Sequence, residues 1–551
     1  MKNRIFNRIP ERFVPVFLFI VLSVPLWALP NFWDSLPDAE LAQKIVKEMT
    51  NEEALAQIFM FGWAGADPSK EVIDWVSIRS LGNIKVFGWN TDNNHKVAQS
   101  VATLQKLSAQ GRFEIPLFVA TDQEGGWIRH IKGKTSETPG NLAIGASGLP
   151  SDAWYSGYYI AREIAALGIN LNFAPTIDLY TDHESTVIGP RSFGEDPESV
   201  GILGAAFMAG SREAGVLSTA KHFPGHGHTG IDSHGQLPVI NISSKTLESR
   251  ELIPFEYLIK AGVPAIMSAH LSFPSIINSG CPASFSSYFL QDLLREKLGF
   301  TGLIITDDIM MNGATSWAGS VSKAVRLAIE AGNDIIESST TPFFNDTMWT
   351  ANISRMETNK DFRLRVEDAA TRVIKAKLEY FKSGKAVPLL PDENLIDSRV
   401  PDPKGKNFFL SQAARSVTFV RAASIPLNPE KAGKILLVSA FPDFLASGTK
   451  RFVTADTSGT KGNLYTKAKG YDTVIICLSN KDDIRLLKDL RYTGAKIIVI
   501  SALSPVLLTE VPWVTDAIAI YSYSPFSFAA AFSALAGDFI PNGTMPLRGV
   551  E

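Results

Sequence analysis

Residues 217–228 read LSTAKHFPGHGH, a short strand-forming run that ends in a loop dense in lysine, histidine and glycine. Runs of this kind alternate with longer amphipathic stretches from about residue 40 to residue 385. This alternation is typical of repeated strand–helix units around a parallel sheet. The candidate strands are Gln57–Phe61, Ile84–Phe87, Leu117–Thr121, Asn170–Ala174, Leu217–Ala220, Ala265–Ser268, Leu303–Thr306 and Asp334–Glu337.

Helical patterns fill most of the intervals between these eight runs. They cover His95–Ala109, Ala153–Leu167, Thr246–Ala261, Ser322–Ala331 and Asp361–Phe381. Eight strand–helix units in a segment of this length predict a (β/α)₈ barrel of the TIM type, which we place at residues 35–384.

The rest of the chain predicts a linker and a second domain. Residues 385–406 hold several prolines and charges, a composition typical of a linker. Residues 407–551 predict an open α/β sandwich of common domain size. Its candidate strands are Ile435–Ser439, Thr473–Leu478, Lys496–Ser501 and Ala517–Tyr521, and its candidate helices are Asp482–Arg491 and Phe526–Ala536.

Residues 1–29 differ in character from the rest. Lys2, Arg4, Arg8 and Arg12 precede a mostly apolar run, Phe13–Leu29. Basic residues before such a run are typical of a secretory signal peptide, so we expect an exported protein that is periplasmic, extracellular or membrane-anchored. A buried core helix is the alternative, and an uncleaved anchor stays open because the run is long enough for a short membrane span.

Length and composition exclude several classes of protein. The 551 residues are 45% apolar and 20% charged, which is ordinary globular usage and excludes collagen-like, coiled-coil and largely disordered chains. With 53 basic against 56 acidic residues there is no cationic surplus, so nucleic acid is not an expected partner. Cys281 and Cys477 lie far apart, which supports neither a disulfide framework nor a thiolate metal site.

In a (β/α)₈ barrel the active site lies at the carboxyl ends of the strands. A solvated loop or a helix cap explains any single polar residue there, but polar residues follow five neighbouring candidate strands and together predict a site. These residues are Asp122–Gly126, Pro175–Asp178, Lys221–His228, His270 and Asp307–Asp308.

Asp307 and Asp308 are adjacent at a strand end, so only one of the two side chains can point into the barrel mouth. A carboxylate in that position suits a nucleophile or a stabiliser of a developing cation. A helix N-cap is the alternative.

One glycine-rich loop holds His222, His226, His228, His234 and Asp232. Asp232 and His234 are two residues apart, so they lie on one side of an extended chain and can hydrogen-bond. A carboxylate on one ring nitrogen raises the basicity of the other, which makes the pair a candidate proton carrier. The alternatives are an unrelated exposed histidine and a metal site at His226 and His228, whose spacing resembles that of metal-dependent barrel hydrolases.

Taken together, KHFPGHG (221–227), DSH (232–234) and DD (307–308) closely resemble glycoside hydrolase family 3, in its β-N-acetylglucosaminidase branch. DQEGG (122–126), NFAP (172–175) and RSFG (191–194) resemble further family blocks in the same order. The linker, the second domain and PNGTMP (541–546) are similar to those of the two-domain members.

The resemblance implies a retaining exo-glycosidase that removes terminal β-linked N-acetylglucosamine from peptidoglycan fragments through a covalent glycosyl-enzyme. It implies Asp307 as the nucleophile and His234, paired with Asp232, as the acid and base. It implies a small glycan substrate and no metal or organic cofactor, and no protein partner is evident. The residues that would hold the sugar hydroxyls and the N-acetyl group are Asp122, Arg191, Lys221 and His222.

One position departs from the family pattern. The family carries an arginine eight positions beyond the aspartate of the DQEGG block, where this chain has His130, with Arg129 one place earlier. Either Arg129 takes that role as a substrate ligand through a shifted loop, or the outer hydroxyls of the sugar are bound in a different way in this protein. Trp127 also differs, and it either stacks on a sugar ring or packs under the loop.

Two further functions stay open. A phosphorylase could use the same nucleophile, because a histidine acid/base does not repel phosphate as a carboxylate does. A non-catalytic glycan-binding protein needs sugar contacts but no nucleophile, and the presence of Asp307, Asp232 and His234 argues against it.

Overall fold

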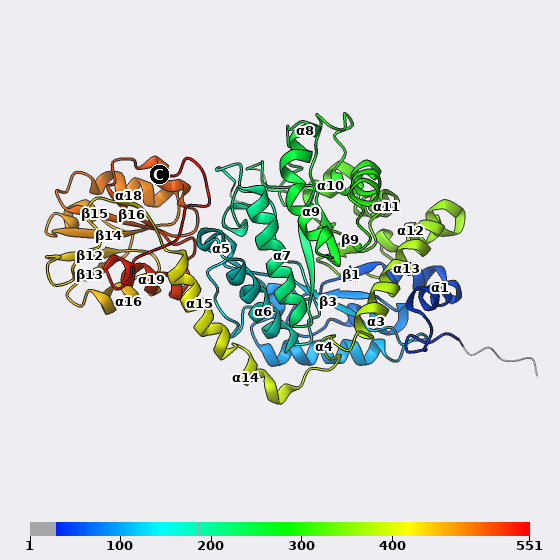
Figure 1. Ribbon diagram of the computed structural model, residues 1–551. Helices are drawn as coiled ribbons and strands as arrows, with labels where there is room; N and C mark the ends of the chain where they lie inside the picture. The colour runs from blue at the N-terminus through cyan, green and yellow to red at the C-terminus, as the bar shows by residue number, and fades with distance from the viewer. Residues whose placement is uncertain (1–28, 186, 231) are drawn as a thin grey trace, which may run out of the picture.

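The computed structural model describes residues 29–185, 187–230 and 232–551. The expected signal peptide or anchor over residues 1–29 lies outside these residues, apart from Leu29. Two bodies lie side by side, a larger one that ends near residue 385 and a smaller one coloured orange to red (Figure 1). Within the described ranges, no helix has the length and apolar character needed to cross a membrane.

The larger body contains an eight-stranded parallel sheet with the order β10-β1-β2-β3-β6-β7-β8-β9. A parallel bridge between Ile305 and Ile335 joins β9 to the residues before β10, so the sheet closes on itself. The predicted (β/α)₈ barrel is therefore confirmed. Its strands are β1 (Phe59–Phe61), β2 (Asn83–Lys85), β3 (Phe118–Thr121), β6 (Leu171–Asn172), β7 (Leu217–Phe223), β8 (Ala265–Ser268), β9 (Leu303–Thr306) and β10 (Ile336–Ser338).

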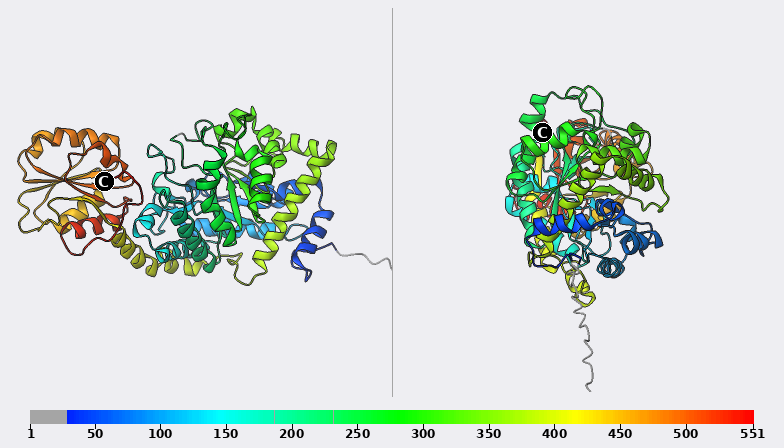
Figure 2. Two further views of the ribbon diagram at one scale, coloured as in Figure 1. Left: turned by 45° about the horizontal axis from the view of Figure 1, so that its top comes forward. Right: turned by 90° about the vertical axis from the view of Figure 1, so that its right-hand side faces the viewer.

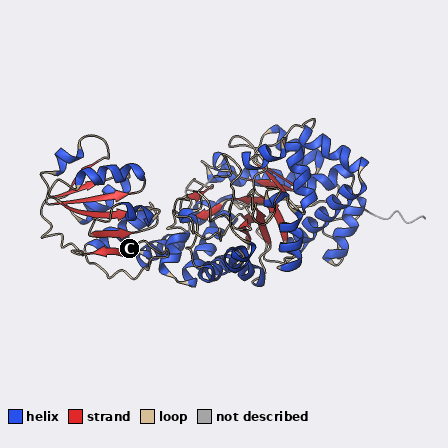
Figure 3. Cartoon of the chain, turned by 90° about the horizontal axis from the view of Figure 1, so that it is seen from above, coloured by secondary structure: helices blue, strands red, loops and turns tan. Residues whose placement is uncertain are grey.

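Helices surround these strands when the molecule is viewed from above (Figure 3). They are α1 (Asp38–Glu48), α2 (Asn51–Gln57), α3 (Lys70–Arg79), α4 (Asn94–Ser108), α5 (Asn141–Ser147), α6 (Pro150–Ala165), α7 (Pro197–Glu213), α8 (Ser244–Thr246), α9 (Ile253–Lys260), α10 (Asn312–Ala318), α11 (Val321–Ala331), α12 (Thr347–Thr358) and α13 (Lys360–Phe381). Two π-helical segments, Leu247–Glu251 and Tyr288–Lys297, and 3₁₀ turns at Gly88–Asn90, Gly189–Arg191 and Ala283–Phe285 complete this body.

Two elements differ from the predicted ranges. Strand β7 extends to Phe223, so Lys221 and His222 lie on the strand and not on the loop after it. The helix expected over Thr246–Ala261 is divided into α8, a π-helical segment and α9. Pro254 lies in the first turn of α9, where a missing backbone N–H costs nothing.

The smaller body is an α/β domain with the strand order β11-β16-β15-β14-β12-β13. Side chains alternate between its two faces, as the pleat requires: Ile475 and Cys477 belong to the apolar cluster on one face, and Val474 and Ile476 to that on the other. The antiparallel edge strand β11 and the short strand β13 were not predicted. The strands are β11 (Thr418–Ala422), β12 (Ile435–Val438), β13 (Asp456–Ser458), β14 (Thr473–Leu478), β15 (Lys496–Ser501) and β16 (Asp516–Ala519).

Helices cover both faces of this sheet, which agrees with the predicted sandwich. They are α16 (Pro442–Arg451), α17 (Leu464–Ala468), α18 (Lys481–Leu490) and α19 (Pro525–Leu535), together with the 3₁₀ helix Pro505–Glu510.

The connection between the two bodies runs along the barrel (Figures 1 and 2). The predicted linker holds the 3₁₀ turn Glu393–Leu395, the short helix α14 (Ile396–Arg399) and the start of α15 (Pro403–Ser416). Arg415 of α15 makes two-nitrogen contact with the carboxylate of Asp152 on α6, the shortest distance being 2.6 Å. Near the end of the chain, the Thr544 amide donates to the carbonyl of Ala146 on the barrel at 2.9 Å. The second domain is thus attached by packing and polar contacts as well as by the linker.

Candidate active site

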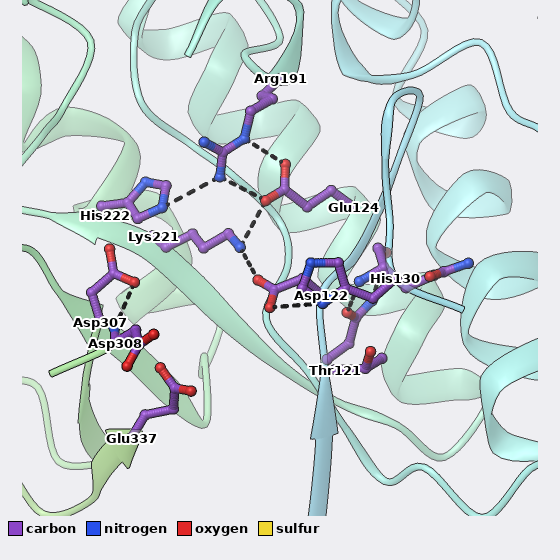
Figure 4. Close-up of polar contacts among 12 residues, drawn as sticks. Thr121, Asp122, Glu124, His130, Arg191, Lys221, His222, Asp307, Asp308 and Glu337 are labelled. Carbon is purple, nitrogen blue, oxygen red and sulfur yellow. Dashed lines mark hydrogen bonds and ion pairs between the residues drawn. The ribbon is translucent and has the colours of Figure 1, made fainter. Parts of the chain in front are cut away.

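A continuous chain of ion pairs lies at the carboxyl ends of the barrel strands (Figure 4). The Lys221 ammonium lies 2.6 Å from Asp122 Oδ1 and 2.7 Å from Glu124 Oε1. Arg191 then donates from Nε and Nη2 to both oxygens of Glu124, at 3.0 and 2.8 Å. All four side chains are largely buried, so each charge depends on its partners and not on water.

The charges of this chain control the protonation of its two carboxylates. Burial by itself would raise the pKa of Asp122, but Lys221 and Lys85 hold it well below its ordinary value. Burial opposes ionisation of Glu124 in the same way, and Arg191 with Lys221 lowers its pKa to about 2. Both groups are therefore anionic acceptors at neutral pH, suited to bind hydroxyl and amide donors of a ligand.

A tight hairpin directs Asp122 and Glu124 into the site. Strand β4 (Gln123–Gly125) pairs with β5 (Ile128–Arg129), and the chain turns at Gly125 and Gly126, whose φ angles are +94° and +60°. A side chain at Gly126 would also meet the Cα atom of Gly140 at 3.2 Å. The turn of this hairpin therefore favours glycine at both positions of the DQEGG block.

His222 is oriented by a buried aspartate. Its Nδ1 lies 2.6 Å from Asp178 Oδ2, and Asp178 Oδ1 accepts the amides of His222 and His226 at 3.1 and 2.7 Å. Because Nδ1 donates to the carboxylate, the His222 Nε2 lone pair faces the Arg191 guanidinium, at 3.4 Å. Asp178, in the loop after β6, thus orients the His222 ring and fixes the imidazole tautomer.

Asp307 follows β9 and lies across the site from Asp122, with Lys221 between the two in the view of Figure 4. Its side chain is buried, and its Oδ1 accepts the amide of Asp308 at 2.9 Å. Burial tends to raise the pKa of Asp307, but His222, His270 and the Asp308 amide lower it below its ordinary value. Asp307 is therefore an ionised carboxylate at neutral pH, which a nucleophile requires.

His270 and Asp308 support the backbone around Asp307. The His270 ring Nε2 lies 3.2 Å from the carbonyl oxygens of both aspartates, and its Nδ1 lies 2.7 Å from Ser284 Oγ. The Asp308 carboxylate accepts the amides of Met310 and Ser339, each at 3.0 Å. The Asp308 side chain therefore holds the backbone that follows β9 and β10.

Asp232 and His234 form a pair, but at a distance from this network. His234 Nδ1 lies 2.7 Å from Asp232 Oδ1, and the side chains are 70% and 52% exposed. Neither side chain contacts Asp307, Asp122 or Lys221 within the described part of the chain. The pair thus has the predicted local geometry and lies on an exposed loop.

The structure brings His130, and not Arg129, to Asp122. His130 Nδ1 lies 3.6 Å from Asp122 Oδ2. Arg129 donates instead to the Thr135 carbonyl at 2.8 Å and contacts Glu137 at 3.3 Å, and no contact with Asp122 is found among the described residues. Trp127 lies at the hairpin tip and is 38% exposed, so it is not packed beneath the loop.

His226 and His228 do not form a metal site in the structure. The His226 ring is buried, and neither ring nitrogen has a hydrogen-bond partner within the described ranges. His228 Nδ1 lies 3.2 Å from Thr181 Oγ1. The described residues contain no group of three or more histidine, cysteine, aspartate or glutamate side chains arranged to hold a metal ion.

Sequence reasoning missed two residues of this site, Lys85 at the end of β2 and Glu337 on β10. Lys85 Nζ lies 3.0 Å from Asp122 Oδ2 and 3.4 Å from Glu337 Oε1. Burial raises the pKa of Glu337 well above its ordinary value although Lys85 opposes the shift. The sequence did offer a signal, because Lys85 is the one lysine in an apolar candidate strand and Glu337 is the one glutamate in another. A charge buried inside a barrel needs a partner, so the two residues could have been predicted to pair.

A cavity of about 610 Å³ lies at the other end of the barrel, where strands β6 to β9 begin. Its walls include Leu171, Leu217, Ala265 and Leu303, and it contains none of the polar residues described above. This cavity is therefore not the candidate active site. The candidate active site is identified by the charged side chains that converge at the opposite end of the barrel.

The fold and the site define a two-domain barrel protein with an ionised aspartate beside a chain of buried ion pairs. The family model for the glycosyl hydrolase family 3 N terminal domain matches residues 47–376, more than half of the chain. The chain belongs to glycosyl hydrolase family 3.

Named relatives extend this comparison. A beta-hexosaminidase from Tolumonas auensis is 37% identical over 260 residues, which are 47% of this chain and 75% of that protein. Beta-hexosaminidase A from Pseudoalteromonas piscicida is 35% identical over 280 residues, and this chain spans about half of its length, 47%. A family 3 beta-N-acetylglucosaminidase structure from Paenibacillus sp. superposes with a TM-score of 0.82 at 27% identity, covering 91% of this chain and 99% of that chain.

Proposed function

We propose that the protein is a retaining exo-β-N-acetylglucosaminidase that hydrolyses terminal β-linked N-acetylglucosamine. The observation that carries the proposal is the ionised Asp307 at the end of β9, facing the Asp122–Lys221–Glu124–Arg191 chain (Figure 4). The hexosaminidase names of the relatives supply the sugar class.

In this proposal Asp307 attacks the anomeric carbon while His234 protonates the leaving oxygen, so the C1–O bond breaks and a glycosyl-enzyme ester forms. His234 then removes a proton from water, and the water oxygen attacks the anomeric carbon. The C1–O bond to Asp307 breaks, the carboxylate is regenerated, and the sugar leaves with its original anomeric configuration. Asp232 orients the His234 ring through the 2.7 Å contact between its Oδ1 and the ring Nδ1. The mechanism requires the exposed Asp232–His234 pair to approach the glycosidic oxygen when sugar occupies the barrel mouth.

Asp122, Lys221, His222 and Arg191 are assigned to the hydroxyl and N-acetyl groups of the sugar. Their charges are paired before a ligand arrives, so little reorganisation accompanies binding. We assign no ligand role to Arg129, because its guanidinium is engaged with Thr135 and Glu137. The mechanism assigns no step to a metal or an organic cofactor.

We further propose that the protein is exported and acts on peptidoglycan fragments. The basic and apolar N-terminal sequence supports export. An exported enzyme that removes N-acetylglucosamine meets that sugar in the cell wall. Fractionation of cells that express the full chain tests export, and retention in the cytosol would contradict it.

The first experiment compares p-nitrophenyl β-N-acetylglucosaminide with the β-glucoside, each with and without chelator and with and without phosphate. We expect release of nitrophenol from the N-acetyl sugar only, unchanged by chelator. Formation of sugar 1-phosphate, with a rate that rises with phosphate, would replace the hydrolase by a phosphorylase. Cleavage of neither glycoside would favour a glycan-binding protein, and activity lost with chelator would favour a metal-dependent hydrolase.

Asp307→Ala is expected to lower kcat by at least about 1,000-fold with an unchanged thermal midpoint, because the covalent intermediate can no longer form. Mass spectrometry after treatment with a fluorinated N-acetylglucosaminyl donor should locate the adduct on Asp307. Normal turnover in this variant, or an adduct elsewhere, would remove Asp307 from the nucleophile role.

A further inference from the structure

Both oxygens of Asp122 are occupied by lysine ammonium groups. Lys221 approaches Oδ1 at 2.6 Å, and Lys85 approaches Oδ2 at 3.0 Å. Lys85 comes from a different strand, β2, and its side chain is only 6% exposed. Asp122 therefore cannot rotate about its terminal bond without breaking one of two charged contacts in a buried setting.

The Lys85 ammonium is itself enclosed on several sides. It lies 4.4 Å from the ring centroid of Phe87 and 4.9 Å from that of Phe173. Both distances suit cation–π attraction, which is strongest where water is excluded. The two aromatic rings leave the ammonium little freedom to move.

Glu337 is a further neighbour of Lys85, and the Asp308 carboxylate also acts electrostatically on this ammonium. Its side chain is fully buried, and its Oε1 lies 3.4 Å from Lys85 Nζ. Neither carboxyl oxygen has a hydrogen bond in the part of the chain that the structure describes. A buried carboxyl group with no other partner is costly, so its position beside Lys85 indicates a function for the pair.

We propose that Lys85, braced by Glu337, is a positioning residue that holds Asp122 in the orientation that reads the hydroxyls of the bound sugar. The inference rests on the proposed function, because it takes Asp122 as a sugar ligand. Asp122 and Asp307 lie on opposite sides of the site (Figure 4), so Asp122 meets the end of the sugar ring opposite the anomeric carbon. The hydroxyl nearest that end is carried by C4 or C6.

This role predicts an effect on binding more than on chemistry. A hydroxyl contact at the far end of the ring is made in the ground state and in the transition state alike, so its loss raises KM and changes kcat little. A carboxylate held in one orientation also distinguishes an equatorial from an axial C4 hydroxyl. A carboxylate free to rotate would lose part of that discrimination.

The test uses the full chain with p-nitrophenyl β-N-acetylglucosaminide and its 4-epimer, the β-N-acetylgalactosaminide. For Lys85→Met we expect KM for the glucosaminide to rise about tenfold or more while kcat changes by less than about threefold. The ratio of kcat/KM between the two epimers should fall toward unity. A KM and an epimer ratio equal to those of the wild type would overturn the inference.

Further variants separate positioning from stability. Lys85→Met alone leaves Glu337 buried without a cation, whereas Lys85→Met with Glu337→Leu replaces the whole pair by apolar groups, which is often neutral or stabilising. We expect the double variant to regain the thermal midpoint and keep the raised KM. If KM returns together with the thermal midpoint, the pair is structural only. Glu337→Leu alone removes the acceptor beside Lys85 and should also raise KM, and a wild-type KM in this variant would contradict the bracing role.

Lys377 is a matched control, because it is also a fully buried lysine but contacts the Gly82 carbonyl and Gln57 at the other end of the barrel. Lys377→Met should leave KM unchanged, and an equal rise in KM would refute a specific role for Lys85. If the wild type cleaves neither glycoside, the proposed function fails by itself. Equal affinity of wild type and Lys85→Met for N-acetylglucosamine in calorimetry would then refute the inference separately.

Discussion

At the scale of the residue, the carboxyl groups of the site differ in the number of cations that each one faces. Asp122 faces Lys221 and Lys85, and its pKa is lowered well below the ordinary value. Glu337 has only Lys85, at 3.4 Å, and burial raises its pKa well above the ordinary value. Burial penalises the charged form of both groups. The two lysines overcome this penalty at Asp122, whereas the carboxylates of Asp308, Asp307 and Asp122 add to it at Glu337.

His234→Ala tests the proton carrier. An activated aryl leaving group departs without protonation, whereas a sugar leaving group requires it. We expect kcat/KM to fall by about 100-fold more on a disaccharide than on the p-nitrophenyl glycoside. Steady-state kinetics on the two substrates, with Asp232→Asn as a companion variant, provides the comparison. Equal losses on both substrates would count against the acid role.

His226 predicts a pH dependence of stability. Burial, with smaller contributions from nearby His222 and Arg191, lowers its pKa from 6.5 to about 4, although Asp178 opposes the shift. Because the folded pKa lies below the unfolded one, His226 stabilises the fold fully above pH 6.5, and this contribution is lost as the pH falls toward 4. The loss amounts to about 3 kcal/mol at most.

The measurement is the thermal midpoint of the wild type and of His226→Asn between pH 7 and pH 4. The wild type should lose more stability over this interval than the variant, which lacks the titrating group. Parallel profiles for the two proteins would show that His226 contributes nothing to acid sensitivity.

At the scale of the element, the loop after β7 depends on one close backbone approach. A Cβ atom at Gly227 would lie 1.5 Å from the carbonyl oxygen of Leu179, next to Asp178. The Gly227 carbonyl also accepts the Asp182 amide at 3.1 Å. Glycine at position 227 therefore lets the loop pack against the segment that contains Asp178, the residue that binds the His222 ring.

Gly227→Ala is expected to displace this loop and to lower kcat/KM by about tenfold or more, because site residues tolerate little misplacement. Gly230→Ala, in the same loop, is the control: its nearest neighbour would be the Glu184 carbonyl oxygen at 3.4 Å, an ordinary contact. Activity assays and thermal midpoints of both variants give the readout. Equal activity of the two variants would contradict the close-approach argument.

At the scale of the whole molecule, a polar contact attaches the second domain to the barrel. Asp152 is nearly fully buried on α6 and meets Nε and Nη2 of Arg415, whose side chain is 38% exposed. Arg415→Ala would leave that carboxylate without its cation and should cost about 1–2 kcal/mol, less than for a fully buried pair because the arginine is partly solvated.

The expected readouts are a lower thermal midpoint and faster proteolysis in the 385–406 segment, with kcat on the aryl glycoside unchanged. Lys481→Ala removes the exposed contact with Glu184, 3.0 Å long, and should change stability by less than about 0.5 kcal/mol. If both variants behave alike, the Asp152–Arg415 contact does not attach the domains.

Several features of the protein follow from the sequence by itself. Strands β8, β9, β14 and β15 coincide with their predicted ranges, because their apolar runs are bounded by clear turn residues. The alternation of strands and helices is a local signal. A (β/α)₈ barrel is the closed arrangement that buries the apolar faces of these strands and helices. Residues at the strand ends, such as Asp122, Lys221 and Asp307, could be selected because parallel strands end at a common edge.

Only the tertiary structure decided how these side chains pair. Lys85 and Glu337 lie 252 positions apart in sequence (337 minus 85), and barrel closure brings them within 3.4 Å of each other. The hairpin after β3 turns Arg129 toward Glu137 and brings His130 to Asp122. Strand and helix patterns depend on neighbours along the chain, whereas ion pairing and burial depend on distances in space, and these exist only after the barrel has closed.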